Sequence, residues 1–216
     1  MRKLMLSAGL CAFALTANTA VFAESPVPAK VEAAAAQTVE EYEFDKVHTQ
    51  VLFFVNHIGF SNSQGEFHDY DGHFVFDREH PENSSVEVTI QTASIDMDDK
   101  AWDDHMKNKD FFDVEKFPAM TFKSTMIKVT GEKTADIIGD LTILGVTKPA
   151  TLNVTYNKSD IHPFSKKYVS GFSATAKVKR SEYGMNYGLP VIADDVEIRI
   201  EVEGMRKEAA AVEAAE

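Results

Sequence analysis

The chain has almost no cysteine, because Cys11 is the only one among 216 residues. It lies in an apolar run over residues 4–15, which follows two basic residues and precedes a small-residue sequence at residues 21–23. A basic start, an apolar run and a small-residue cleavage site are the features of a secretory signal peptide. We therefore expect residues 1–23 to be removed on export. The mature chain would then have no thiol for a disulfide or a metal centre.

Basic residues and long apolar segments are also scarce beyond the signal. The remaining 193 residues contain 20 Lys and Arg against 34 Asp and Glu, a formal charge of −14. Such an acidic balance argues against nucleic acid and anionic membrane surfaces as partners. No later stretch approaches the ~20 apolar residues that a membrane-spanning helix needs. We therefore expect a soluble protein without stable membrane insertion.

The familiar motifs of catalytic and metal sites are missing as well. The seven histidines form no pair with zinc-ligand spacing. The acidic run that begins at Asp96 resembles the start of a calcium loop, but Lys100 occupies the fifth position and no glycine follows at the sixth. Nucleophile elbows and glycine-rich phosphate loops do not occur. The sequence therefore predicts no catalytic residue, no metal and no cofactor.

What the chain does have is a regular alternation of apolar and polar residues. The clearest case is DDVEIRIEVEG, in which the apolar residues Val196, Ile198, Ile200 and Val202 alternate with charged ones. A period of two is typical of a strand with one buried and one wet face. Eight such long strands, most of them joined by short connections, favour an all-β antiparallel barrel that leaves no exposed edge.

The composition divides the chain into one domain and two tails. Residues 24–40 mix prolines with an alanine run and read as a flexible spacer, and residues 205–216 are an Ala/Glu-rich tail. Between them, residues 41–204 show no linker-like break or internal repeat. Turn signals separate the strands, for example from Asn62 to Gly65.

Residues 94–124 carry a short acidic helix pattern and a lid-like loop between two strands. Asp98 or Asp99 is the expected helix N-cap, and Trp102 and Met106 lie four residues apart on one helix face. Large apolar side chains follow, among them Phe111, Phe112 and Phe117. They are too many for a connection that only crosses solvent, so either a lid over a ligand cavity or a satellite cluster under a long loop is expected.

The barrel interior is the place where function would lie. At eight strands it can be filled by side chains or can hold one ligand, and periodicity alone does not choose between these. The mature chain keeps 13 of the 15 phenylalanines, many of them on inward faces. His57 continues the inward face of Phe53 and Val55, and a hydrogen-bonded core histidine is favoured there over a ligand contact or a catalytic base.

Several blocks of the sequence, in order, are similar to the YceI-like family of exported lipid-binding proteins. They are VHTQVLFFVNHIGF, GEFHDYDGHFVFD, TASIDM, DDHMKNKDFFDVEKFPAMTFKST, GDLTILGVTKP and VEIRIEVEG, and they span residues 42–204. The resemblance implies an eight-stranded antiparallel lipocalin-like barrel whose apolar cavity holds a polyisoprenoid or similar amphiphile. It also implies a periplasmic location. The lid helix departs from the family in having Trp102-Asp103, which leaves the head-group and chain-length preferences open.

The leading hypothesis is a non-enzymatic carrier for an isoprenoid lipid or a quinone-like amphiphile. His57 or Tyr183 would meet the polar head. One alternative is an enzyme that modifies such a lipid with histidine and aspartate as acid and base, and another is a packed barrel that binds a protein partner; a homodimer stays open. The expected ligand-binding residues are Phe53, Val55, His57, Phe74, Phe76, Val88, Ile90, Phe111, Phe112, Phe122, Leu141, Ile143, Phe172, Tyr183 and Ile198.

Overall fold

The computed structural model describes residues 39–208. The predicted signal peptide, most of the predicted spacer and the end of the predicted tail lie outside these residues. The described part contains eleven strand segments, one α-helix and three short 3-10 turns. In chain order these are β1 (Val39–Phe44), β2 (Gln50–His57), β3 (Ser61–Phe67), β4 (Tyr70–Asp77), η1 (Pro81–Asn83), β5 (Ser85–Gln91), η2 (Thr92–Ser94), β6 (Ile95–Asp96), α1 (Lys100–Lys107), β7 (Ala119–Gly131), β8 (Thr134–Ile143), β9 (Val146–Ile161), β10 (Tyr168–Lys179), η3 (Arg180–Tyr183) and β11 (Ile192–Arg206).

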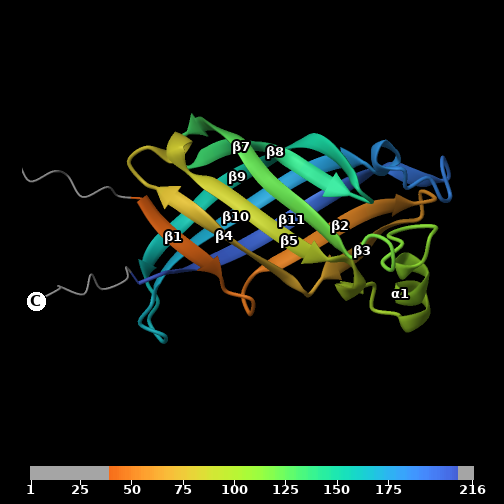
Figure 1. The fold of residues 1–216 in the computed structure, drawn as a ribbon, viewed down its shortest axis with the longest axis horizontal. Helices are drawn as coiled ribbons and strands as arrows, with labels where there is room; N and C mark the ends of the chain where they lie inside the picture. Colours follow the sequence, from red (N-terminus) through yellow and green to blue (C-terminus); the bar gives the residue numbers. More distant parts are fainter. Residues whose placement is uncertain (1–38, 209–216) are drawn as a thin grey trace, which may run out of the picture. The chain divides into compact units, whose positions relative to one another are not determined.

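The strand segments form eight long antiparallel strands that close into a barrel (Figure 1). The ring runs β1-β4-β5-β7-β8-β9-β10-β11, and β11 closes it by pairing back with β1. Three of the eight strands are interrupted, so that β2, β3 and β6 continue β1, β4 and β5 beyond short breaks. The predicted eight-stranded antiparallel barrel is confirmed, although eleven separate segments compose it.

The break between β1 and β2 is held by local hydrogen bonds of a polar side chain. The Val47 backbone N–H donates to the Asp45 carboxylate at 2.9 Å, and the Thr49 N–H donates to the Asp45 carbonyl at 2.9 Å. Tyr70, at the start of β4, donates its hydroxyl proton to the Thr49 carbonyl at 2.5 Å. A short acidic side chain competes in this way with ladder hydrogen bonds and lets the strand bend as it crosses the barrel.

The predicted turn at residues 62–65 is wrong, because these residues lie within β3. The hairpin reverses earlier, at Ile58 and Gly59, which both have positive φ. The Asn56 side chain accepts the Gly59 N–H at 2.9 Å and fixes this tight turn. Gly65 serves a different purpose, since a Cβ atom there would lie 2.4 Å from Phe53 and Met97 side-chain atoms. It is a glycine because two core side chains occupy its face of the strand.

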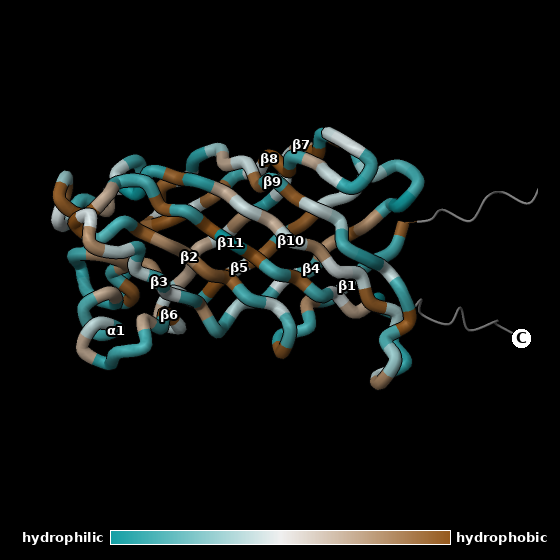
Figure 2. The backbone as a smooth tube through the Cα atoms, turned by 180° about the vertical axis from the view of Figure 1, so that it is seen from behind, coloured by the Kyte–Doolittle hydropathy of each residue, from teal (hydrophilic) through white to brown (hydrophobic). Residues whose placement is uncertain are grey.

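Alternation along the strands sorts side chains to the inside and the outside of the barrel. Figure 2 shows hydrophobic and hydrophilic residues alternating along the backbone. In the β10–β11 pair, Phe172, Ala174 and Ala176 lie opposite Val202, Ile200 and Ile198, and all of these line the interior. The barrel extends two residues past each predicted boundary, because β1 begins at Val39 and β11 ends at Arg206.

The single α-helix among residues 39–208 covers one end of the barrel. Asp99 is its N-cap and accepts the Trp102 N–H at 2.9 Å, as the capping pattern predicts. Both β1 and β11 reach the opposite end of the barrel (Figure 1). No helix in this part of the chain is long and apolar enough to cross a membrane.

The main hydrophobic core lies where the helix segment meets the barrel, and it comprises Phe53, Phe67, Ile95, Met97, Met106, Phe111, Phe112, Met120 and Met185.

Candidate functional site

The barrel interior is hollow and contains two adjoining cavities of about 420 Å³ each. Inward residues such as Val55, Val88 and Ile198 are only half-buried, because they border this internal space. Side chains shared by both walls form a waist between the cavities. The waist consists of Val51, Val88, Ile90, Phe122, Leu152 and Ile200.

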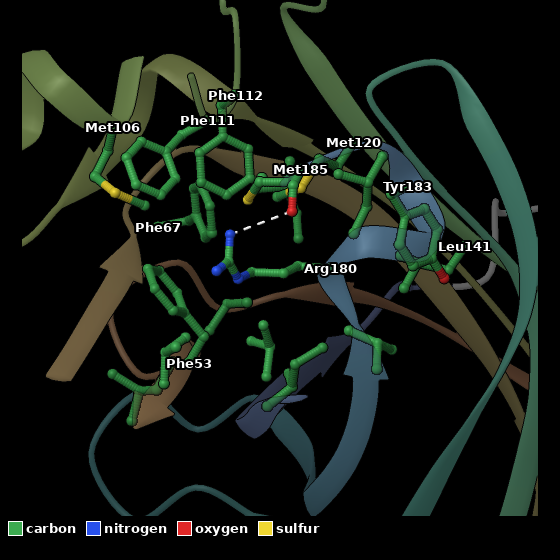
Figure 3. Close-up of a pocket in the computed structure, with 18 of the residues that line it drawn as sticks. Phe53, Phe67, Met106, Phe111, Phe112, Met120, Leu141, Arg180, Tyr183 and Met185 are labelled. Carbon is green, nitrogen blue, oxygen red and sulfur yellow. Dashed lines mark hydrogen bonds between the residues drawn. The ribbon is translucent and has the colours of Figure 1, made fainter. Parts of the chain in front are cut away.

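The first cavity, which we call the helix-side cavity, lies beneath α1 and the loop that follows it. Phe111 and Phe112 are buried in its wall together with Met106 (Figure 3). The Phe112 ring meets the Phe67 ring edge-on at 5.4 Å, and the Phe111 ring lies 5.2 Å from that of Tyr187. These side chains belong to the main core and also cover the cavity. The segment therefore combines features of both sequence interpretations, since the same side chains form a packed cluster and lie over the cavity.

Phe117 has a different position from the one suggested by the lid interpretation. It lines neither cavity. A Cβ on Gly145 would come within 3.0 Å of the Phe117 ring, and the Phe117 carbonyl accepts the Thr92 hydroxyl at 2.8 Å. Phe117 therefore anchors the return of the lid segment into β7.

Arg180 is a buried cation in the wall of the helix-side cavity, with only 5% of its surface exposed. Its guanidinium donates to four backbone carbonyls, those of Met185, Tyr187, Ile192 and Ala193, at 2.8 to 3.2 Å. Burial lowers its pKa, and the nearby Asp194 carboxylate opposes that shift. Figure 3 shows the guanidinium among the aromatic side chains of the cavity. Arg180 thus holds the 185–193 loop against the barrel end and places a positive charge beside apolar space.

The sequence analysis missed Arg180, although a signal for it exists. It continues the inward parity of Phe172, Ala174, Ala176 and Val178 along β10. A charged residue at an inward position marks a buried polar group that needs partners. The partners come from a loop that local sequence patterns do not place.

Tyr183 brings a second polar group to this cavity. Its side chain is 3% exposed, and its hydroxyl has no hydrogen-bond partner among residues 39–208. Burial raises the pKa of this hydroxyl, and the charge of Glu182 raises it further. The hydroxyl therefore stays protonated at neutral pH. The ring lies beside Leu141 in Figure 3. Tyr183 therefore offers a hydrogen-bond donor to whatever occupies the cavity.

His57 is not the hydrogen-bonded core histidine that the sequence favoured. It is half-buried in the cavity wall, and its ring makes no hydrogen bond within the part of the chain that the structure describes. The reason is its place at the last residue of β2, where the barrel opens toward the lid segment. His105 of α1 also lines this cavity, and its Nε2 lies 3.5 Å from a carboxylate oxygen of Asp110.

The second cavity, which we call the far cavity, contains an aromatic cluster in its wall. Phe172 meets Phe74 and Phe76 edge-on at 5.4 and 5.2 Å, and the Tyr156 ring lies 5.6 Å from that of Phe172. The Phe74 ring occupies the space above Gly204. A Cβ atom on that glycine would lie only 2.3 Å from the ring, so a larger residue at position 204 would displace Phe74. The polar residues of this wall include Arg78, Ser84, Glu132 and Lys133.

All fifteen residues predicted to bind a ligand line one cavity or the other. That they touch a ligand stays a prediction. The helix-side cavity is lined by Phe53, Val55, His57, Phe111, Phe112, Leu141, Ile143, Tyr183 and Ile198, the far cavity by Phe74, Phe76 and Phe172, and both by Val88, Ile90 and Phe122. The methionines of the helix-side cavity were missed: Met97, Met106, Met120 and Met185.

The arrangement suits a long apolar molecule with one polar end. Apolar side chains form most of both walls. The polar groups Arg180, Tyr183, His57 and His105 are buried or half-buried in the helix-side cavity, whereas the charged residues of the far cavity wall, Arg78, Glu132 and Lys133, are exposed. Such cavities, mostly apolar with a few polar groups that fix orientation, are typical of small-molecule binding sites.

Comparisons with known proteins agree on the kind of protein. A family model described as a YceI-like domain matches residues 42–204. A UPF0312 protein of Pseudomonas putida (strain W619) is 38% identical over 169 residues, which cover 77% of this chain and 87% of the relative. The crystal structure of a Campylobacter jejuni YceI protein is 32% identical with a TM-score of 0.65, and the match covers 71% of this chain and 90% of that one.

A more distant structure shares the fold. It is described as a polyisoprenoid binding domain from Saccharophagus degradans implicated in plant cell wall breakdown. It is 14% identical with a TM-score of 0.58, and the match covers 77% of this chain and 98% of that one.

Proposed function

The chain belongs to the YceI-like family, and on that premise we propose that it binds a long-chain isoprenoid lipid or quinone-like amphiphile inside the barrel. The observation that carries the proposal is the pair of adjoining apolar cavities that together occupy the barrel interior. Neither side-chain packing nor the lid segment fills this space. The alternative of a packed barrel that binds a protein partner assumed an interior filled by side chains, and the cavities speak against it.

The energetics favour a long guest over a short one. Each buried methylene contributes about 0.8 kcal/mol, so roughly ten of them contribute about 8 kcal/mol. Association costs an estimated 4 to 15 kcal/mol in lost freedom, and ten methylenes are therefore close to the minimum for useful affinity. A chain that passes the waist and enters the far cavity buries more methylenes and binds correspondingly more tightly.

The class of guest is supported by the structural neighbour from Saccharophagus degradans, whose description names polyisoprenoid binding. The shared fold provides the same kind of interior, and the cavity walls here are aromatic, methionine and branched aliphatic side chains. Methionine adapts to irregular apolar shapes, as a methyl-branched isoprenoid chain requires. We carry the ligand class to this chain on these grounds.

The polar end of the guest lies in the helix-side cavity in this proposal. Arg180 and the free hydroxyl of Tyr183 are there, and His57, the last residue of β2, lines the same cavity. The charged residues of the far cavity wall are exposed, and its interior holds an aromatic cluster, which suits the end of a hydrocarbon chain. The guest would therefore lie with its polar end beneath the lid segment and its tail beyond the waist.

The protein would act as a non-catalytic carrier in the periplasm, exported by residues 1–23. A carrier needs to cover its guest and release it without changing it. The buried Phe111 and Phe112 provide the cover, on a segment that joins the barrel through β6 and β7.

Native mass spectrometry of the purified protein, followed by organic extraction, tests the proposal. We expect a copurifying isoprenoid lipid, chemically unchanged, and rebinding of a fluorescent isoprenoid analogue to the extracted protein. Ile198→Gln should weaken rebinding because it places an amide in the cavity wall, whereas Glu197→Gln on the adjacent outward position should not. Folded, extracted protein that binds no isoprenoid analogue would overturn the proposal. Recovery of a modified lipid would favour the enzyme alternative.

A further inference from the structure

Three metal-ligating side chains converge on the outer surface of the barrel, beside the lid segment. Glu66 lies near the end of β3, His68 directly follows that strand, and Asp96 comes from β6. The His68 Nε2 atom lies 3.0 Å from a carboxylate oxygen of Asp96 and 3.5 Å from one of Glu66. These atoms face solvent on the side opposite the cavities, so this cluster is separate from the ligand site.

The strand register puts two negative charges directly opposite each other. Glu66 pairs with Asp96 in the antiparallel ladder of β3 and β6. Like charges at directly opposed positions destabilise a strand pair unless a positive charge lies between them. A bound divalent cation would supply that charge, with the imidazole nitrogen as one of its ligands.

The donor atoms are held in position by neighbouring groups. The Asp98 N–H donates to the second carboxylate oxygen of Asp96 at 2.8 Å, which fixes the orientation of that carboxylate. This backbone hydrogen bond lowers the pKa of Asp96, and the contact with His68 lowers it by a smaller amount. Supporting contacts such as this backbone hydrogen bond on Asp96 orient the ligands in metal sites. The backbone N–H of His68 donates to the Ser94 carbonyl at 3.3 Å, which fixes the chain at that ligand.

The spacing matches that of a small divalent ion with nitrogen and oxygen ligands. Tetrahedral zinc has metal–ligand distances of about 2.0 to 2.2 Å, which place ligand atoms roughly 3.3 to 3.6 Å apart. The two measured separations, 3.0 and 3.5 Å, lie within small side-chain adjustments of that range. Calcium would need six to eight oxygen ligands, more than these three side chains offer.

We propose that Glu66, His68 and Asp96 bind a divalent transition-metal ion, best matched by zinc, with water at the fourth position. The site ties β3 to the short strand that leads into α1. Phe67, between the first two ligands, points inward and meets Phe112 edge-on. The ion therefore braces the strand pair directly behind a residue that covers the helix-side cavity.

A second cluster offers a matched control. Asp45, His48 and Glu203 also lie close together, but His48 bonds Asp45 within a single turn at 2.8 Å. That aspartate also accepts the Val47 N–H and shapes the strand break. Substituting His48 removes one exposed histidine without touching the proposed site.

Zinc titration by calorimetry tests the site, with protein purified in chelator and without a histidine tag. We expect one zinc ion per chain and a higher melting temperature with zinc. His68→Gln and Asp96→Asn should each weaken zinc affinity at least tenfold and reduce the gain in melting temperature. His48→Gln should bind zinc as the original protein does. Circular dichroism confirms that each variant is folded. Absence of zinc binding, or binding that survives in His68→Gln and is lost in His48→Gln, would overturn the proposal.

Discussion

Glu40 contacts three other side chains beside the β1–β11 pair that closes the barrel. Its carboxylate accepts the Tyr42 hydroxyl at 2.6 Å and an Arg78 N–H at 2.8 Å, and it also accepts from Arg206. Both arginines lie over the ring of Tyr168, at 4.9 and 4.3 Å. These contacts join β1 to residues at the ends of β4, β10 and β11. One carboxylate thus fastens the seam where the first and last strands meet.

Replacing Glu40 by Gln should destabilise the protein by about 1 to 3 kcal/mol at pH 7, because charge-assisted hydrogen bonds are lost. Burial alone would raise the pKa of Glu40, but the bonds from Tyr42, Arg206 and Arg78 outweigh it and lower the pKa. A lowered folded-state pKa means that the stabilisation is present above the ordinary value of 4.5 and is lost as the pH falls through the folded value. Urea unfolding at pH 7 and near pH 3 measures this difference.

The control for this experiment is Glu43→Gln, because Glu43 is exposed and its one ion pair within residues 39–208 is with Lys207, at 3.3 Å. That variant should stay within about 0.5 kcal/mol of the original protein at both pH values. A Glu40→Gln deficit that persists unchanged near pH 3 would show that shape, and not charge, explains the loss.

At this scale the sequence predicts which side chains face inward, because parity along a strand is a local property. It placed Phe122, Leu141 and Phe172 correctly in the cavity walls. It did not bring Glu66 and Asp96 together, since that depends on the register between β3 and β6. Nor did it find the acceptors of Arg180, which lie on a loop without periodic pattern.

The helix and the strand breaks show the same division among elements. The helix α1 begins at one of the two predicted caps, because the Asp99 cap and the amphipathic spacing are local features of the sequence. The break after β1 depends on Tyr70, which reaches it from another strand, and no local pattern gives that contact. The eight strands could therefore be predicted, but their interruptions could not.

Replacing Asp99 by Ala should loosen the lid segment more than the barrel. The Asp99 carboxylate accepts the Trp102 N–H, and loss of such a cap costs about 1 kcal/mol. Because Met106 and Phe111 depend on α1 for their positions, a fluorescent isoprenoid analogue should dissociate several-fold faster, while thermal unfolding of the empty barrel changes by only a few degrees.

Asp104→Ala provides the comparison on the same helix. Asp104 makes an exposed ion pair with Lys100 at 2.6 Å, and exposed pairs of this kind contribute little. Its dissociation rate should match that of the original protein. Equal off-rates for the Asp99 and Asp104 variants would contradict the lid role of α1.

For the whole molecule, closure of the barrel follows from eight alternating strands, whereas the hollow interior does not. A packed core and a cavity wall have the same period, so the volume between inward side chains appears only once the strands are placed. The structure divides that volume at the waist, with Ala174 in the far cavity and Ala176 in the helix-side cavity. These two alanines share a strand and a face, and both are buried.

Replacing each of them by Leu tests how the guest lies across the two cavities. Ala174→Leu displaces two or three methylenes of a chain that passes the waist, which costs about 2 kcal/mol, or a roughly 15- to 50-fold loss in affinity. This loss should appear for long isoprenoid analogues and be absent for short ones that end before the waist. Ala176→Leu should weaken both, because every guest occupies the helix-side cavity. Unchanged affinity for long analogues in Ala174→Leu would mean that the chain does not pass the waist, and the far cavity would then have another occupant.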